Sequence, residues 1–183
     1  MFANQLVIPF RCDPLSDLPS REAWEAVERT NASVLGFLLQ GVDLDAMPRP
    51  ADERLAEALA PVRIKLDMIT NMISRFLYRD VALPASRNVE LGPNRIAWRY
   101  PLAVQCGACF RIELYFDAIF REPLVIFGRV VSSVEQGQDD GYRIEAQLIE
   151  MSERIGEGLL RLVFLTQRHQ RARYASKSAR SNT

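Results

Sequence analysis

The stretch Leu55–Phe76, LAEALAPVRIKLDMITNMISRF, carries the strongest periodic pattern in the chain. Its large apolar residues recur in alternating steps of four and three, as in a heptad repeat. The d positions are Leu55, Val62, Ile69 and Phe76, and the a positions are Leu59, Leu66 and Ile73. A seam with this period winds helices around one another. We therefore predict that these seven residues line an oligomerisation helix.

The residue types along the seam favour more than two strands. The a layer is mostly Leu and the d layer mostly β-branched, which shifts the preference of coiled coils toward trimers and tetramers. The flanking e and g positions are small or apolar, and they include Ala56, Ala58, Met72 and Leu77. We therefore expect a homo-oligomer, with a tetramer favoured.

Two alternatives to assembly stay open at this point. The apolar face could pack on the rest of its own chain, and Pro61 could be the first helical residue, which would shorten the seam to two heptads. A second stripe of Ile64, Met68 and Met72 faces elsewhere on the helix. We expect this second stripe to make the internal contact.

Length and composition set the class of protein. The chain has 183 residues, 48% hydrophobic and 25% charged, with a net charge of zero. We therefore expect no nucleic-acid partner. No apolar run reaches the length of a membrane span, and the N-terminus shows no leader pattern, so a cytoplasmic location is expected. Three cysteines do not make a disulfide scaffold.

The first third of the chain predicts an arm and two helices. Leu6–Phe10 is a short apolar run, interpreted as an edge strand or a docked arm, and Asp13–Pro19 is interpreted as a loop. Ser20 can cap a helix from Arg21 to about Gln40, which Gly41 would end. Its apolar face contains Trp24, Val27, Val34, Leu35 and Leu38, and is interrupted by Thr30 and Asn31.

The period then changes from helical to alternating. Strands are predicted at Ile96–Tyr100, Phe110–Phe116, Pro123–Glu135 and Tyr142–Leu148, with a possible bend at Gly128 and a hairpin turn at Gln136–Gly141. Ser152 is expected to cap a last helix that runs to about Tyr174. The pattern predicts an α+β fold: a small antiparallel β-barrel with N-terminal helices, one of them the long heptad helix, and a C-terminal helix.

These elements suggest four regions. Residues 1–53 form an arm and helix, residues 54–80 the oligomerisation helix, residues 81–174 the barrel with its C-terminal helix, and residues 175–183 a flexible tail.

The candidate chemistry is sparse. Cys106-Gly-Ala-Cys109 leads into a strand, so it lacks the helix N-terminus that activates a redox pair. A structural zinc site needs four ligands, whereas Cys12 and the single histidine, His169, are distant in sequence. We interpret the pair as a turn with two cysteines, and a metal site or redox chemistry remains an alternative. No enzyme activity and no cofactor are predicted.

The remaining charged residues have plain interpretations. His169 is interpreted as a surface residue. The loop carboxylates are interpreted as solvated turns; they are Asp43, Asp45, Asp139 and Asp140. The arginine-rich C-terminus is interpreted as a solvated helix end, because positive charge there suits the helix dipole.

From about Val89 to Arg173 the sequence resembles the PilZ domain of bacteria. The matching stretches are VELGPNRIAW, VQCGACFRIELYF, PLVIFGRVVSSVE, YRIEAQLIEMSE and a last helix ending FLTQRHQRAR. The heptad helix resembles the variant of this family that carries added helices before the barrel. This resemblance implies a regulatory role, because PilZ domains bind cyclic di-GMP through an R-x-x-x-R motif and a D/N-x-S-x-x-G motif.

The two binding motifs fare differently in this chain. Arg75-Phe-Leu-Tyr-Arg79 has the first spacing, and so does Arg95-Ile-Ala-Trp-Arg99. In the second motif Glu90 takes the place of the Asp, Gly92 that of the Ser and Arg95 that of the final Gly. The hydroxyl of the motif is therefore missing, and Arg95 occupies the position where the nucleotide has to approach the backbone. We therefore predict weak or no binding of cyclic di-GMP.

The leading hypothesis is an atypical PilZ adaptor. It would self-assemble and act on an unidentified protein partner in type IV pilus, motility or cyclic di-GMP pathways. The alternative is a genuine cyclic di-GMP receptor that uses Arg75 and Arg79 or the C-terminal arginines.

Overall fold

The computed structural model describes residues 4–46, 53–79, 82–137 and 141–181. Six antiparallel strands form a closed barrel in the order β1-β2-β3-β6-β5-β4. The strands are β1 (Asn4–Leu15), β2 (Ser86–Leu91), β3 (Arg95–Tyr100), β4 (Cys109–Leu114), β5 (Leu124–Glu135) and β6 (Tyr142–Leu148). The helices are α1 (Arg21–Ala46), α2 (Glu53–Leu77) and α3 (Glu153–Ser181). The predicted α+β barrel fold is confirmed.

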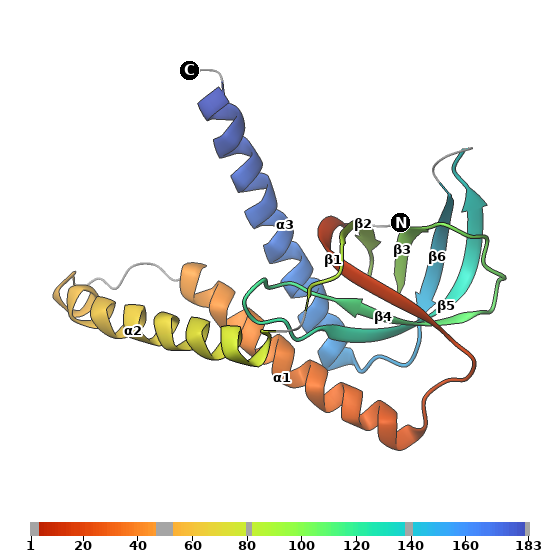
Figure 1. Cartoon of the computed structure of the whole chain (residues 1–183), viewed down its shortest axis with the longest axis horizontal. Coiled ribbons are helices and arrows are strands. Elements are labelled where there is room, and N and C mark those ends of the chain that lie inside the picture. Colours follow the sequence, from red (N-terminus) through yellow and green to blue (C-terminus); the bar gives the residue numbers. More distant parts are fainter. Residues whose placement is uncertain (1–3, 47–52, 80–81, 138–140, 182–183) are drawn as a thin grey trace.

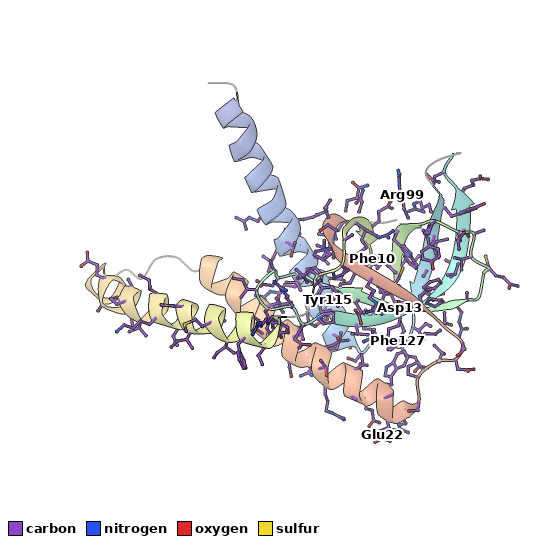
Figure 2. All side chains as sticks on the ribbon, in the orientation of Figure 1. Phe10, Asp13, Glu22, Arg99, Tyr115 and Phe127 are labelled. Carbon is purple, nitrogen blue, oxygen red and sulfur yellow. The ribbon has the colours of Figure 1, made fainter. Side chains whose placement is uncertain are left out.

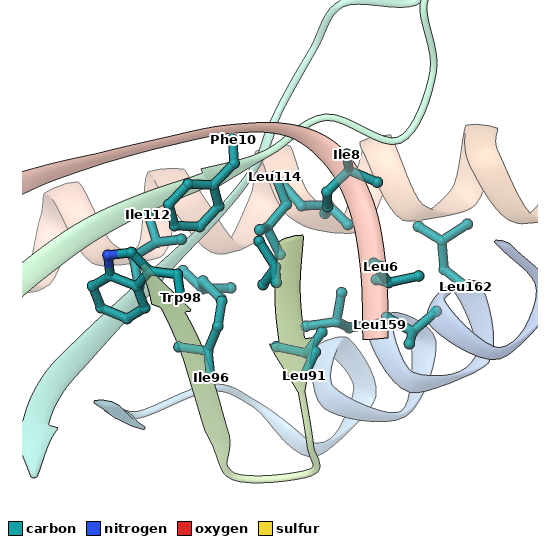
Figure 3. Close-up of a cluster of buried hydrophobic side chains, with 14 of the residues drawn as sticks. Leu6, Ile8, Phe10, Leu91, Ile96, Trp98, Ile112, Leu114, Leu159 and Leu162 are labelled. Atoms are coloured by element: carbon teal, nitrogen blue, oxygen red, sulfur yellow. The ribbon is translucent and has the colours of Figure 1, made fainter. Parts of the chain in front are cut away.

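Strict alternation in the central strands builds the barrel interior. Ile96 and Trp98 of β3, Ile112 of β4 and Ile144 of β6 are each at most 2% exposed. Their neighbours along each strand point outward, as the period of two requires. α3 closes one end of the barrel, where Leu159 and Leu162 approach Leu6 and Leu91 (Figure 3).

β1 differs from the short edge strand or docked arm that the sequence suggests. It is 12 residues long and has a partner on each side, because residues 4–9 pair with β2 and residues 10–15 pair with β4. Pro9 lies where β1 changes partner, and its carbonyl accepts a hydrogen bond from Tyr115 N. The missing N–H of proline therefore falls at the junction of two ladders, where it breaks neither.

α1 begins as predicted and ends later. The Ser20 hydroxyl accepts a hydrogen bond from Ala23 N at 3.3 Å, so Ser20 caps the helix. The helix then passes through Gly41, the expected stop, to Ala46. Glycine costs only about 1 kcal/mol inside a helix, so the surrounding structure can override it.

The outer face of β5 lies under α1 (Figure 1). Trp24 packs on Phe127 with ring centroids 4.7 Å apart. The Asn31 side chain donates to Val125 O at 2.7 Å and accepts from Val125 N at 2.9 Å. Asn31 interrupts the apolar face in the sequence. In the structure it is buried, and its amide makes the same pair of hydrogen bonds with β5 that a neighbouring strand would make.

The last helix is longer than predicted. α3 extends to Ser181, whereas the sequence suggests an end near Tyr174 and a frayed tail. Figure 1 shows its C-terminal half projecting away from the barrel. None of the helices, as far as the structure describes them, is long and apolar enough to cross a membrane.

Two glycines of the barrel lie where the sequence predicts a bend and a hairpin turn. At Gly128 an added Cβ would lie 3.1 Å from the Ala146 Cβ, so glycine allows β5 and β6 to approach closely. The irregularity in β5 lies instead between Val130 and Ser132. Gly141 has a φ of 66°, as the predicted hairpin turn requires, while residues 138–140 lie outside the described part.

Candidate functional site

The apolar seam of α2 is exposed on the single chain. α2 is one continuous helix through Pro61, so the alternative in which Pro61 starts the helix is not observed. The described seam side chains are 51% to 81% exposed; they are Leu59, Val62, Leu66, Ile69, Ile73 and Phe76. The side chain of Leu55 lies outside the described part. These residues do not pack on their own barrel, which was the alternative to assembly.

The second stripe is also exposed, contrary to expectation. Ile64, Met68 and Met72 are 62% to 66% exposed, so they do not make the internal contact that the sequence suggests. The part of α2 that its own chain covers lies near the C-terminal end of the helix, where Ser74 is only 7% exposed. Figure 2 shows side chains standing clear of the barrel along most of α2.

Together the two stripes cover a broad arc of the helix. Successive residues turn by about 100° around a helix axis, so the centre of the second stripe lies roughly 130° around the helix from the centre of the seam. The polar edge that contains Ser74 lies on the remaining side. An apolar arc this wide suits contact with more than one neighbouring helix.

The barrel face that carries the second R-x-x-x-R pair is occupied by ion pairs. Arg95 Nη1 lies 2.6 Å from Glu145 Oε1, and Arg143 Nη2 lies 2.6 Å from Glu90 Oε2. Arg143 Nη1 also lies 3.5 Å from Glu145 Oε2. The hydrogen bonds that Arg143 donates to Glu90 raise the pKa of Arg143. Two arginines and two glutamates thus neutralise one another here.

This network bears directly on anion binding. A phosphate at Arg95 would compete with the carboxylate of Glu145, whose side chain is only 15% exposed, and would meet its negative charge. Gly92 and Arg95 close the turn between β2 and β3, with Gly92 N donating to Arg95 O at 2.8 Å. Arg99 lies on the same strand and its side chain projects outward (Figure 2).

The first R-x-x-x-R pair lies at the end of α2. Arg79 is exposed just beyond the last helical residue, and the side chain of Arg75 lies outside the described part. The structure therefore leaves a site formed by Arg75 and Arg79 as a prediction.

The cysteine pair lies in a turn that leads into β4, as predicted. Gly107 has a φ of 93°, and Ala108 N donates to Gln105 O across the turn. Cys106 is exposed and Cys109 is half-buried. Over the described ranges, no three His, Cys, Asp or Glu side chains gather in a group that could hold a metal ion. The side chain of His169 is not among those described.

Cys12 is poorly suited to such a site. It lies on β1, opposite Ile112, and burial raises the pKa of its thiol to about 11. A thiol with that pKa stays protonated near neutral pH, which disfavours both metal binding and nucleophilic chemistry.

Sequence reasoning missed the contacts that hold the end of α2. The Tyr78 hydroxyl donates to Glu122 Oε1 at 3.1 Å, and Arg121 Nη1 donates to Tyr78 O at 3.3 Å. These partners are more than 40 positions apart, so no local pattern joins them. Tyr78 and Arg121 carry no motif that singles them out.

The known structures identify the architecture. A crystal structure from Xanthomonas campestris superposes with a TM-score of 0.68, covering 92% of this chain and 89% of that one at 21% sequence identity. The chain has the fold of a PilZ domain. The Xanthomonas campestris protein is described as pathogenic, with a tetrameric PilZ domain self-assembled via an unusual helical bundle. No protein-family profile and no curated protein matches the sequence.

Proposed function

We propose that this chain is a PilZ-type regulatory protein that self-assembles through α2, with a tetramer favoured, and acts through protein–protein contacts. The observation that carries the proposal is the exposed apolar face of α2. A helix with this much apolar surface in water needs a partner that covers it. The tetrameric PilZ structure from Xanthomonas campestris supports a second copy of the same chain as that partner.

The energetics of α2 also favour self-assembly. Pro61 inside the helix removes a hydrogen bond and costs about 3 kcal/mol. An isolated helix is marginal in water, and most helical stability comes from packing of an amphipathic face. Since the described part of α2 packs on its own chain only near Ser74 and Tyr78, packing against other copies would supply what the helix lacks.

We further propose that the chain does not bind cyclic di-GMP and is not an enzyme. The ion pairs of Arg95 and Arg143 and the absence of a hydroxyl at Gly92 support the first point. The setting would be the cytoplasm, in type IV pilus, motility or cyclic di-GMP pathways, where the assembled barrels would engage a protein partner.

Titration calorimetry of the full chain with cyclic di-GMP tests the ligand part of this proposal. The expected result is no heat of binding at micromolar concentrations. Heat of micromolar binding that disappears in Arg75→Ala with Arg79→Ala would instead establish the second candidate, a cyclic di-GMP receptor. That candidate is favoured only by the R-x-x-x-R spacing and the exposure of Arg79. Arg129→Ala, a change at an exposed arginine on β5, is the matched control.

A further inference from the structure

The loop between β4 and β5 is held in shape by hydrogen bonds between its own residues. Asp117 Oδ1 accepts hydrogen bonds from Ile119 N at 2.6 Å and from Phe120 N at 2.8 Å, which folds the loop on itself. Arg121 Nε donates to Ala118 O at 3.3 Å. These hydrogen bonds within the loop give it a defined shape.

The same loop contacts both N-terminal helices. Phe120 packs on Phe37 of α1 with ring centroids 4.3 Å apart and an interplanar angle of 34°. On its other side, Arg121 donates to the last turn of α2 at Tyr78 O, and Glu122 accepts from the Tyr78 hydroxyl. We call this set the α2 joint; its residues are Phe37, Ser74, Tyr78, Phe120, Arg121 and Glu122.

The α2 joint contacts α2 on one side of the helix. Ser74 and Tyr78 are one helical turn apart and share a face, and Tyr78 N donates to Ser74 O at 2.9 Å. At about 100° per residue, Ile69, Ile73 and Phe76 lie roughly 100° to 160° around the helix from Ser74. The side of α2 that contains Tyr78 is thus turned to the loop between β4 and β5, and these three seam residues lie on other sides of the helix.

We propose that the α2 joint positions α2 so that its apolar face stays available to other copies of the chain. Without the joint, α2 would be tethered only by the chain segments that join it to α1 and to β2, and it could rotate about its own axis. Burial of apolar surface would then favour turning the seam onto its own barrel or onto α1. This proposal rests on self-assembly through α2, and it assigns Tyr78 and Arg121 as positioning residues.

Sedimentation of the full chain tests the effect on assembly. The variant combines Tyr78→Phe with Arg121→Ala, which removes both hydrogen bonds between the loop and the end of α2. We expect dissociation of the multimer at a protein concentration about tenfold higher than for the wild type, since each lost hydrogen bond is worth a factor of roughly two to ten. The single variant Arg121→Lys keeps a donor for Tyr78 O, so it should retain most of the assembly.

A distance measurement tests the orientation itself, independently of assembly. Spin labels at Glu57→Cys and Gln147→Cys, both exposed, report the separation of α2 from the barrel in a chain whose three native cysteines are changed to Ala. In the monomeric background Leu66→Asp with Ile69→Asp, we expect one narrow distance distribution. The joint variant should broaden it, while Arg129→Ala should not.

The outcomes separate the two proposals. Wild-type chain that sediments as a monomer refutes self-assembly, and the distance distribution still tests the joint. An unchanged narrow distribution together with unchanged assembly in the joint variant overturns the positioning role. If the double variant loses its near-ultraviolet circular dichroism, Tyr78→Phe alone, which deletes one hydroxyl, replaces it with the same expected direction.

Discussion

Charged substitutions at the centre of the seam give the sharpest prediction about α2. Leu66 and Ile69 are 58% and 52% exposed in the single chain, so slightly more than half of each side chain is left to bury. Full burial of such a side chain is worth about 1.5–3 kcal/mol, so the remaining half is worth about 0.8–1.5 kcal/mol. The two residues together contribute about 1.5–3 kcal/mol per chain, and about 6–12 kcal/mol in a tetramer.

Leu66→Asp with Ile69→Asp removes this contribution and adds eight carboxylates to a closed apolar seam. Burying unpaired charge costs more than the lost apolar contact, so the substitutions should abolish assembly. Since each 1.4 kcal/mol is a factor of ten, the association constant should fall by at least about 10⁴. In sedimentation velocity the variant should appear as the 20.8 kDa monomer with an intact barrel.

The matched control places the same charge elsewhere on the helix. Ala60→Asp lies on the exposed polar edge of α2, on the same side as Ser74, and it should leave the multimer intact. The reasoning is refuted if the seam variant keeps the sedimentation coefficient of the wild type, or if Ala60→Asp disrupts the assembly equally.

Three further predictions concern the barrel. Asn31→Ala leaves the buried Val125 N and O without their partner and should lower the free energy of unfolding by about 2–4 kcal/mol in urea titrations, whereas the exposed Ser33→Ala should change it by less than about 0.5 kcal/mol. Gly141→Ala places a Cβ 2.6 Å from Tyr100 O at a φ of 66°, so thermal unfolding should show a loss of about 1–3 kcal/mol, while Gly36→Ala, in open space on α1, should gain about 0.5–1 kcal/mol; equal midpoints would contradict this. Burial raises the pKa of Cys12 from 9.0 to about 11, so its contribution to stability is complete below pH 9 and is lost as the pH rises through 11; the wild type should lose stability relative to Cys12→Ala across that window, and parallel curves would count against it.

The parts of the fold that follow from local pattern could be predicted from the sequence. β3, β4 and β6 place large apolar residues at every second position, and their bounds agree with the prediction within two residues. The seam of α2 also follows from a simple period. In each case the residues that share a face are neighbours along one element, so the pattern is complete within a short window.

The features that depend on closure of the barrel could not be predicted in this way. The prolines of β1 suggest an edge, and only the closed barrel shows that Pro9 lies between two ladders. Asn31 interrupts an apolar stripe in the sequence, and the hydrogen bonds that explain its burial are made with Val125, 94 positions away. The α2 joint likewise combines residues from α1, α2 and the loop after β4, each unremarkable alone.

The mass of the wild-type chain in solution tests the central claim most directly. Sedimentation equilibrium over a range of micromolar concentrations should give a multiple of 20.8 kDa, with the tetramer favoured. A chain that remains a monomer at every concentration, with α2 still helical, would show that the exposed face of α2 does not bring copies together.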